Sequence, residues 1–201
     1  MDDFFGFSNQ YVIDILRKNA AELSGENEEK LYNSFFAVDD YFKKVSKKGL
    51  CHVISSIHYV ILKEQGIEAQ LFIGEVHHNH PLKSYCFDHS WVETNGLIYD
   101  IAVQNPHHGI PHPPVYAGLE LSLKRKPALT YGVMTGYEWS DDTVLVLKTP
   151  FVSYMDQFHY DGKGAWEMVQ ELCQQLGIVV EIHDMRKKYR NVSRSIRRNE
   201  V

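Results

Sequence analysis

Apolar residues recur at helical spacing in the first third of the chain. Residues 9–24 and 27–40 carry apolar side chains three or four positions apart, which is typical of amphipathic helices. The clearest case is 51–65, and Gly66 follows it as a C-terminal stop. The pattern therefore predicts three successive helices.

After the third helix the pattern changes from helical to extended. Three short apolar or alternating segments are predicted to be strands, at residues 70–76, 87–94 and 97–103. Asn95 and Gly96 separate the last two, and this dipeptide favours the two-residue type I′ turn of a β-hairpin. We therefore expect these two strands to pair.

The remaining segments are less regular. Residues 77–81 and 104–114 are rich in His and Pro and are predicted to be loops. Residues 143–148 and 178–182 are predicted to be short strands, and 164–176 has the spacing of a helix. Helices followed by a mostly antiparallel sheet and a helical end indicate an α+β fold.

The composition is that of a globular chain with one core. Of the 201 residues, 44% are hydrophobic, and a chain of this length normally forms one domain. No apolar stretch approaches the roughly 18 residues of a membrane span, and the acidic N-terminus lacks a secretory pattern. We expect neither a membrane protein nor a Sec-exported precursor.

The net charge of −5 argues against a chain built to bind nucleic acid. The charge is uneven, because residues 185–201 hold seven Lys or Arg and one Glu. We expect residues 1–184 to form a single domain and 185–201 a basic tail. Such a tail is either solvated, a frayed helix or the contact for an acidic partner.

Three cysteines, Cys51, Cys86 and Cys173, are an odd number without paired spacing. A disulfide framework is therefore not expected, and a reducing compartment fits better. This favours a cytoplasmic protein, or one delivered into the cytosol of another cell.

Cys51 stands at the start of the third predicted helix. The helix dipole and the free backbone amides at that end favour the thiolate, which is the nucleophilic form of cysteine. The simpler interpretation is a buried structural cysteine.

The predicted hairpin supplies a partner for such a thiol. With residues 95–96 as the turn, paired positions sum to 191, so His89, Trp91 and Asp100 share one face. His89 and Asp100 become diagonal neighbours, with their Cα atoms about 7–8 Å apart. A carboxylate on one imidazole nitrogen leaves the other to face a thiol. A register slip of one residue would separate the two side chains.

These residues lie in segments that resemble the transglutaminase-like superfamily of papain-type thiol enzymes. The resemblance covers about residues 45–103, in the order Cys, His, Asp. It rests on KGLCH at 48–52, QGIEA at 65–69, DHSWVE at 88–93 and GLIYD at 96–100.

The resemblance implies a nucleophile at Cys51, a general base at His89 and an orienting carboxylate at Asp100. It also implies a papain-like core in which the Cys-bearing helix packs on an antiparallel sheet, with helical additions at both ends. Trp91, beside the histidine, is expected either to shield the site and contact substrate or to be core.

The superfamily includes transglutaminases, glutamine deamidases, cysteine peptidases, peptide N-glycanases and related acyltransferases. Their shared step is attack of a thiolate on an amide or ester carbonyl to form an acyl-enzyme, which water or an amine resolves. We expect a peptide or protein glutamine amide as substrate, hydrolysis rather than cross-linking, and no cofactor.

The reaction also needs donors for the oxyanion. The backbone amide of Cys51 is a natural member of that set. A second donor is expected upstream of the cysteine, where Asn33 and Tyr41 are the candidates.

Two other classes remain open. The chain has 11 histidines, and short His-x-His spacing suits zinc, so a metal-binding protein or metallohydrolase is one alternative, beside a merely solvated His-rich loop. A non-catalytic binding module on the same fold is the other. The residues behind the metal alternative are His77, His78, His80, Cys86, His89, His107, His108 and His112.

Overall fold

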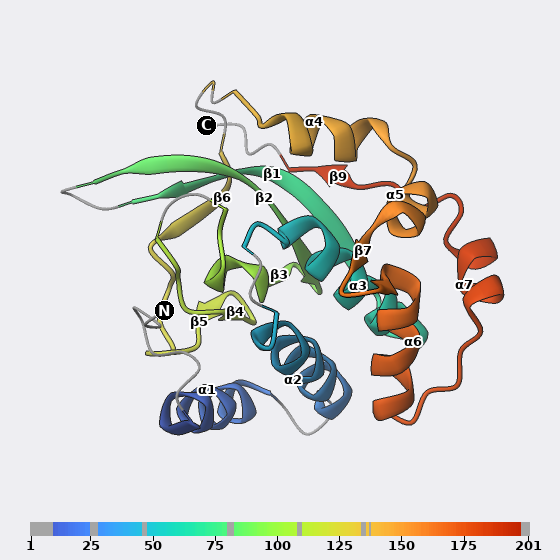
Figure 1. The fold of residues 1–201 in the computed structure, drawn as a ribbon. Coiled ribbons are helices and arrows are strands. Elements are labelled where there is room, and N and C mark those ends of the chain that lie inside the picture. The colour runs from blue at the N-terminus through green and yellow to red at the C-terminus, as the bar shows by residue number, and fades with distance from the viewer. Residues whose placement is uncertain are drawn as a thin grey trace.

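In the computed structural model the chain adopts an α+β fold, as the order of predicted elements indicated. Figure 1 shows a curved sheet above helix α3 (Cys51–Glu64), with other helices below α3, at the right and above the sheet. The structure describes residues 10–24, 28–45, 48–79, 83–107, 110–133, 136 and 138–197.

Seven α-helices and one short 3₁₀ helix occur in these described ranges. They are α1 (Gln10–Leu23), α2 (Glu29–Lys43), α3 (Cys51–Glu64), η1 (Ala102–Gln104), α4 (Asp141–Lys148), α5 (Phe151–Gln157), α6 (Ala165–Gln175) and α7 (Ile182–Lys188). None of the helices in the described part of the chain combines the length and hydropathy needed to cross a membrane.

The main sheet has the strand order β3-β2-β1-β6, and a short strand, β9, lies parallel to β1. Its other pairings are antiparallel. The strands of this sheet are β1 (Gln70–His78), β2 (Tyr85–Thr94), β3 (Leu97–Tyr99), β6 (Leu129–Val133) and β9 (Ser195–Ile196). Two small hairpins join β4 (Val115–Tyr116) to β5 (Leu119–Glu120) and β7 (His159–Tyr160) to β8 (Lys163–Gly164).

Helix α3 is the centre of the core. Ten of its 14 residues are buried, which is expected of a helix covered on several sides rather than on one stripe. It packs against β1 and β2 on one side and against α2 and α6 on others. The first residue of this helix, Cys51, is therefore held by a helix that lies at the centre of the core.

The hairpin between β2 and β3 forms in the predicted register. Val92 pairs with Tyr99 and Thr94 pairs with Leu97, so paired positions sum to 191. Asn95 and Gly96 have φ values of 52° and 75°, and positive φ at both turn positions is what a type I′ turn requires. The prediction that set His89 beside Asp100 is confirmed at the level of the backbone.

The second strand of the hairpin is shorter than predicted. It ends at Tyr99 because the backbone of Asp100 turns to pair with Val115, and η1 then follows. The prediction of a loop at residues 77–81 is also partly wrong. His77 and His78 continue β1, whereas 80–82 lie outside the described residues.

Two other predicted strands are wrong. Residues 143–148 belong to α4, whose N-cap Ser140 accepts a hydrogen bond from the Thr143 amide and whose first turn holds two aspartates. These are helix-start signals, and they outweigh a short apolar run. Residues 178–182 form no strand and lead into α7. Strand β6 had no clear signal in the sequence.

The basic end of the chain, as far as residue 197, is not the solvated tail that its composition predicts. Met185 and Tyr189 are buried in the core formed by α3, α5 and α6. Further on, Arg194 lies 4.6 Å from the ring centre of Tyr154, and β9 joins the main sheet. The structure therefore anchors this segment to the domain through Met185, Tyr189, Arg194 and β9, while most of its other residues are exposed.

Removal of the Tyr189 side chain tests this packing. The residue is 2% exposed, stacks on Trp166 at 6.3 Å and donates a hydrogen bond to Glu64 at 2.6 Å. We expect Tyr189→Ala to lower the free energy of unfolding by about 3–5 kcal/mol, as for other buried aromatic truncations. Urea unfolding measures this.

The matched control is Val179→Ala, because Val179 is 93% exposed and should change stability by less than about 0.5 kcal/mol. Equal effects of the two substitutions would contradict the packing of residues 185–197.

Candidate active site

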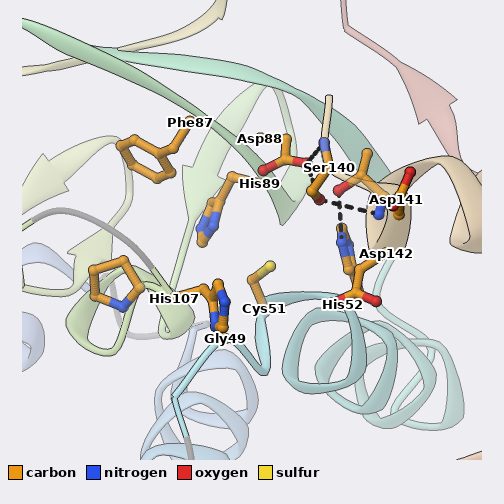
Figure 2. A pocket seen from close by; sticks show the side chains of 12 residues that line it. Gly49, Cys51, His52, Phe87, Asp88, His89, His107, Ser140, Asp141 and Asp142 are labelled. Carbon is orange, nitrogen blue, oxygen red and sulfur yellow. Dashed lines mark hydrogen bonds between the residues drawn. The ribbon is translucent and has the colours of Figure 1, made fainter. Parts of the chain in front are cut away.

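Cys51 is the first residue of α3 and is half-buried. Leu50 precedes it, and a leucine side chain offers no oxygen to cap the first-turn amides. Figure 2 shows the sulfur of Cys51 directed into a pocket, among the rings of His89, His52 and His107. The thiol thus meets the uncapped, positive end of a buried helix.

The pocket is a cavity of about 210 Å³. Its walls come from the segment that leads into α3, from β2, from the loop after η1 and from the start of α4. The lining residues are Gly49, Cys51, His52, Phe87, Asp88, His89, Pro106, His107, Ser140, Asp141, Asp142 and Thr143.

His89 and Asp100 are joined beside this cavity. Nε2 of His89 lies 2.8 Å from Oδ2 of Asp100, and each residue is 1% exposed. Because Asp100 occupies Nε2, Nδ1 is the nitrogen left to face the cavity. The structure therefore brings together the histidine and the carboxylate that the hairpin register predicted.

The carboxylate of Asp100 has further donors. The Tyr131 hydroxyl donates to Oδ2 at 2.7 Å, and the Val103 amide donates to Oδ1 at 3.1 Å. A buried carboxylate needs such partners, because an unsatisfied charge in the interior is costly. Tyr131 comes from β6, and no local pattern in the sequence places it beside Asp100.

Two ionisable groups of the cavity, the thiol of Cys51 and the imidazole of His89, have strongly shifted pKa values. Burial by itself would raise the pKa of the Cys51 thiol, but the charges of His52 and His89 and hydrogen bonds with them outweigh burial and lower that pKa to about 5. Burial would lower the pKa of His89, but the charge of Asp100, its hydrogen bond and the nearby thiol raise it to about 10.

His52 fixes the start of α3 to its surroundings. Its Nδ1 lies 2.7 Å from the Ser90 hydroxyl on β2, and its Nε2 lies 3.0 Å from the Thr143 hydroxyl on α4. A second link joins the same elements, since Asp88 accepts hydrogen bonds from the amide and the hydroxyl of Ser140. Two polar links therefore hold α4 as one wall of the cavity.

Trp91 is expected either to contact substrate at the site or to be core, and the structure places it in the core. It is 0% exposed, does not line the cavity and donates its indole N–H to Glu93 at 3.0 Å. Its ring stacks on Phe72 and meets Tyr131 at 5.0 Å. Trp91 is core, and it packs against the tyrosine that supports Asp100.

The two upstream candidates for an oxyanion donor are also not at the cavity. Asn33 is exposed on α2, and Tyr41 lines a separate surface groove with Lys163. The prediction of a donor at either position is wrong, because neither residue lines the cavity that holds Cys51. The backbone amide of Cys51 remains at the site.

Four of the histidines behind the metal alternative fall in two places: the ring centres of His78 and His112 are 4.7 Å apart, and His89 and His107 line the cavity. His77 and His78 lie on β1 and Cys86 on β2, while His80 and His108 lie outside the described residues. Within the described ranges, no three His, Cys, Asp or Glu side chains are arranged to hold a metal ion. His112 instead hydrogen-bonds the Tyr85 hydroxyl through Nε2 at 3.1 Å.

Comparison of the chain with models of protein families, with curated proteins and with solved structures finds no match. The chemistry open to this site is therefore inferred from the geometry and the ionisation of its own residues.

The pH dependence of alkylation tests the shifted thiol. A thiol is nucleophilic above its pKa, so we expect iodoacetamide to label Cys51 with a midpoint near pH 5. Cys173 should stay unlabelled, because burial and Glu64 raise its pKa to about 11. Peptide mass spectrometry gives the rate at each cysteine.

In His89→Ala the midpoint for Cys51 should move up by one or more units, because a group that lowers the pKa is lost. His183→Ala, at an exposed position on α7, is the control and should leave it unchanged. A wild-type midpoint near the ordinary value of about 8.5 would contradict the shifted thiol.

Gly49 is required by the shape of the loop before Cys51. Its φ is +74°, and a Cβ there would lie 2.9 Å from both Cβ and Nδ1 of His107. We expect Gly49→Ala to cost about 1–2 kcal/mol for the left-handed backbone and also to slow alkylation of Cys51 by displacing the loop.

Gly96→Ala is a close control, because Gly96 has a φ of +75° and nothing within 4 Å of an added Cβ. Both variants should lose stability in urea, and only Gly49→Ala should slow the labelling. Equal labelling rates would show that the contact with His107 does not hold the cavity in shape.

Proposed function

We propose that this chain is a cysteine-dependent acyl-transfer enzyme of the transglutaminase-like type, with a papain-like core. Its substrate is the amide of a peptide or of a glutamine side chain. The single observation that carries the proposal is the convergence on one cavity of Cys51, at the head of a buried helix, and His89, bound to Asp100.

The pKa shifts support the ionisation state that this chemistry needs. A thiol with a pKa of about 5 beside an imidazole with a pKa of about 10 is a thiolate beside an imidazolium at neutral pH. The buried negative charge of Asp100 stabilises the imidazolium and fixes the orientation of its ring.

In the first half-reaction the Cys51 sulfur attacks the carbonyl carbon of the amide, and the C–N bond breaks. The imidazolium of His89 gives its proton to the departing nitrogen, which leaves as ammonia or as an amine. A thioester remains on Cys51. The negative oxygen that forms during attack is stabilised by the Cys51 backbone amide, which has no acceptor within the helix.

In the second half-reaction a water molecule attacks the thioester carbonyl. Neutral His89 takes a proton from that water, the C–S bond breaks, and the thiolate returns with a carboxylic acid as the product. An amine in place of water would give transamidation. We propose that the acceptor is water, so the products are those of a deamidase or peptidase.

Activity of three variants tests this assignment. With a pool of synthetic glutamine-containing peptides, we expect Cys51→Ala to abolish ammonia and peptide-fragment release. Asp100→Ala should lower the rate by about 10²–10⁴-fold, the usual contribution of an oriented general base. Intact-protein mass spectrometry should detect the thioester in the wild type and not in Cys51→Ala.

Cys86→Ala is the control for loss of a thiol that does not line the cavity, and it should retain activity. Activity retained in Cys51→Ala would refute the mechanism. Zinc in the purified protein, with activity lost on its removal, would favour the metallohydrolase alternative. An unreactive Cys51 without metal would favour the binding module.

A further inference from the structure

The walls of the cavity differ in chemical character. Asp88, Asp141 and Asp142 are among its lining residues, and none of the described residues that line it is Lys or Arg. Figure 2 shows Asp141 and Asp142 beyond His52, on the opposite side of the cavity from Phe87. One side is therefore acidic and the other has an aromatic ring.

The three carboxylates are not neutralised by neighbouring cations. In the part of the chain that the structure describes, none of them forms an ion pair with Lys or Arg. Hydrogen bonds from Ser140 and Thr143 outweigh the burial of Asp88 and lower its pKa, which keeps this carboxylate charged. Asp141 and Asp142 are exposed.

The cavity is identified as a binding site by two residues other than these carboxylates. They are Cys51, whose sulfur points into it, and His89, which is 1% exposed and reaches the same space. The thiolate and imidazolium of the proposed mechanism cancel each other in charge, and the buried carboxylate of Asp100 lies behind the imidazolium. The aspartates of the cavity wall therefore add to a negative field beside the nucleophile.

We infer that the cavity selects a substrate with a cationic group beside the attacked amide, such as the side chain of Lys or Arg in a peptide. This inference rests on the proposed function and adds the substrate class to it. The cation lies against Asp141 and Asp142 while the amide carbonyl lies at Cys51.

The aspartates have a second physical role that the test must separate. Asp141 and Asp142 lie in the first turn of α4, where negative charge stabilises the helix dipole. That role affects the stability of α4 and does not depend on what enters the cavity.

Charged thiol reagents test the inference without knowledge of the natural substrate. Methanethiosulfonates transfer their RS group to a thiolate, forming a disulfide and releasing methanesulfinate, so the bond-forming step is the same whatever the charge of R. The probes are the trimethylammonioethyl cation, the sulfonatoethyl anion and the neutral methyl compound. Each rate at Cys51 is divided by the rate with free cysteine.

For the wild type we expect the cation to react with Cys51 about tenfold or more faster than the anion at low salt, with the ratio falling as salt is added. The double variant Asp141→Asn/Asp142→Asn should lower the ratio severalfold, with each rate divided by the neutral rate of the same variant. Asp184→Asn, which removes one exposed carboxylate on α7, should leave the ratio unchanged.

A wild-type ratio near one, or a ratio unchanged in the double variant, would overturn the inference. A lower melting temperature with an unchanged ratio would assign the two aspartates to α4 alone, which also overturns it. In each case rapid labelling of Cys51 by the neutral reagent would still support the proposed function. Neutral labelling of Cys51 as slow as that of Cys173 would instead refute the proposed function.

Peptides provide the second arm. Glutamine peptides that differ only in having Lys, norleucine or Glu next to the glutamine should rank in that order in kcat/KM. The double variant should reduce the difference between Lys and Glu severalfold. Equal kcat/KM for the three peptides in the wild type would refute a cationic substrate.

Discussion

The carboxylate of Asp100 is the interaction on which the rest of the site depends. It is buried and accepts hydrogen bonds from His89 on β2, Tyr131 on β6 and the amide of Val103 in η1. Burying this charge is tolerable only because both oxygens are satisfied. The same backbone position pairs with Val115, so the end of the hairpin, the sheet edge and the following loop are fixed together.

The opposite wall of the cavity depends on a separate set of polar contacts. His52 bridges the hydroxyls of Ser90 and Thr143, and Asp88 holds the N-cap of α4 through Ser140. These bonds join α3, β2 and α4 at the point where the thiol lies. The acidic side of the cavity is a consequence of this docking, because the first turn of α4 brings Asp141 and Asp142 with it.

Electrostatics connect the two walls. Burial disfavours charge on both the thiol and the imidazole. The pKa of Cys51 nevertheless falls, because His52 and His89 stabilise the thiolate, and that of His89 rises, because Asp100 and the thiolate stabilise the imidazolium. Under the proposed mechanism this gives one group that is a strong nucleophile and another that can donate and then accept a proton. Neither property belongs to a residue by itself.

The parts of this protein that depend on local interactions were determined by the sequence alone. Asn95-Gly96 specifies a type I′ turn within four residues, and the period-two alternation of the strands then places His89 and Asp100 on one face. Gly66 and the apolar spacing of residues 51–65 likewise predict that a helix begins at Cys51. These signals act over a few residues, so they survive without any knowledge of the fold.

Only the tertiary structure decided what surrounds those residues. The pairing of β6 with β1 brings Tyr131 to Asp100, and the docking of α4 brings three of its residues and Ser140 to a cysteine about 90 positions earlier. The same packing buries Trp91, leaves Asn33 and Tyr41 elsewhere and draws residues 185–197 onto the domain. Such contacts are set by the shapes and buried areas of distant segments, and no local pattern in the sequence encodes them.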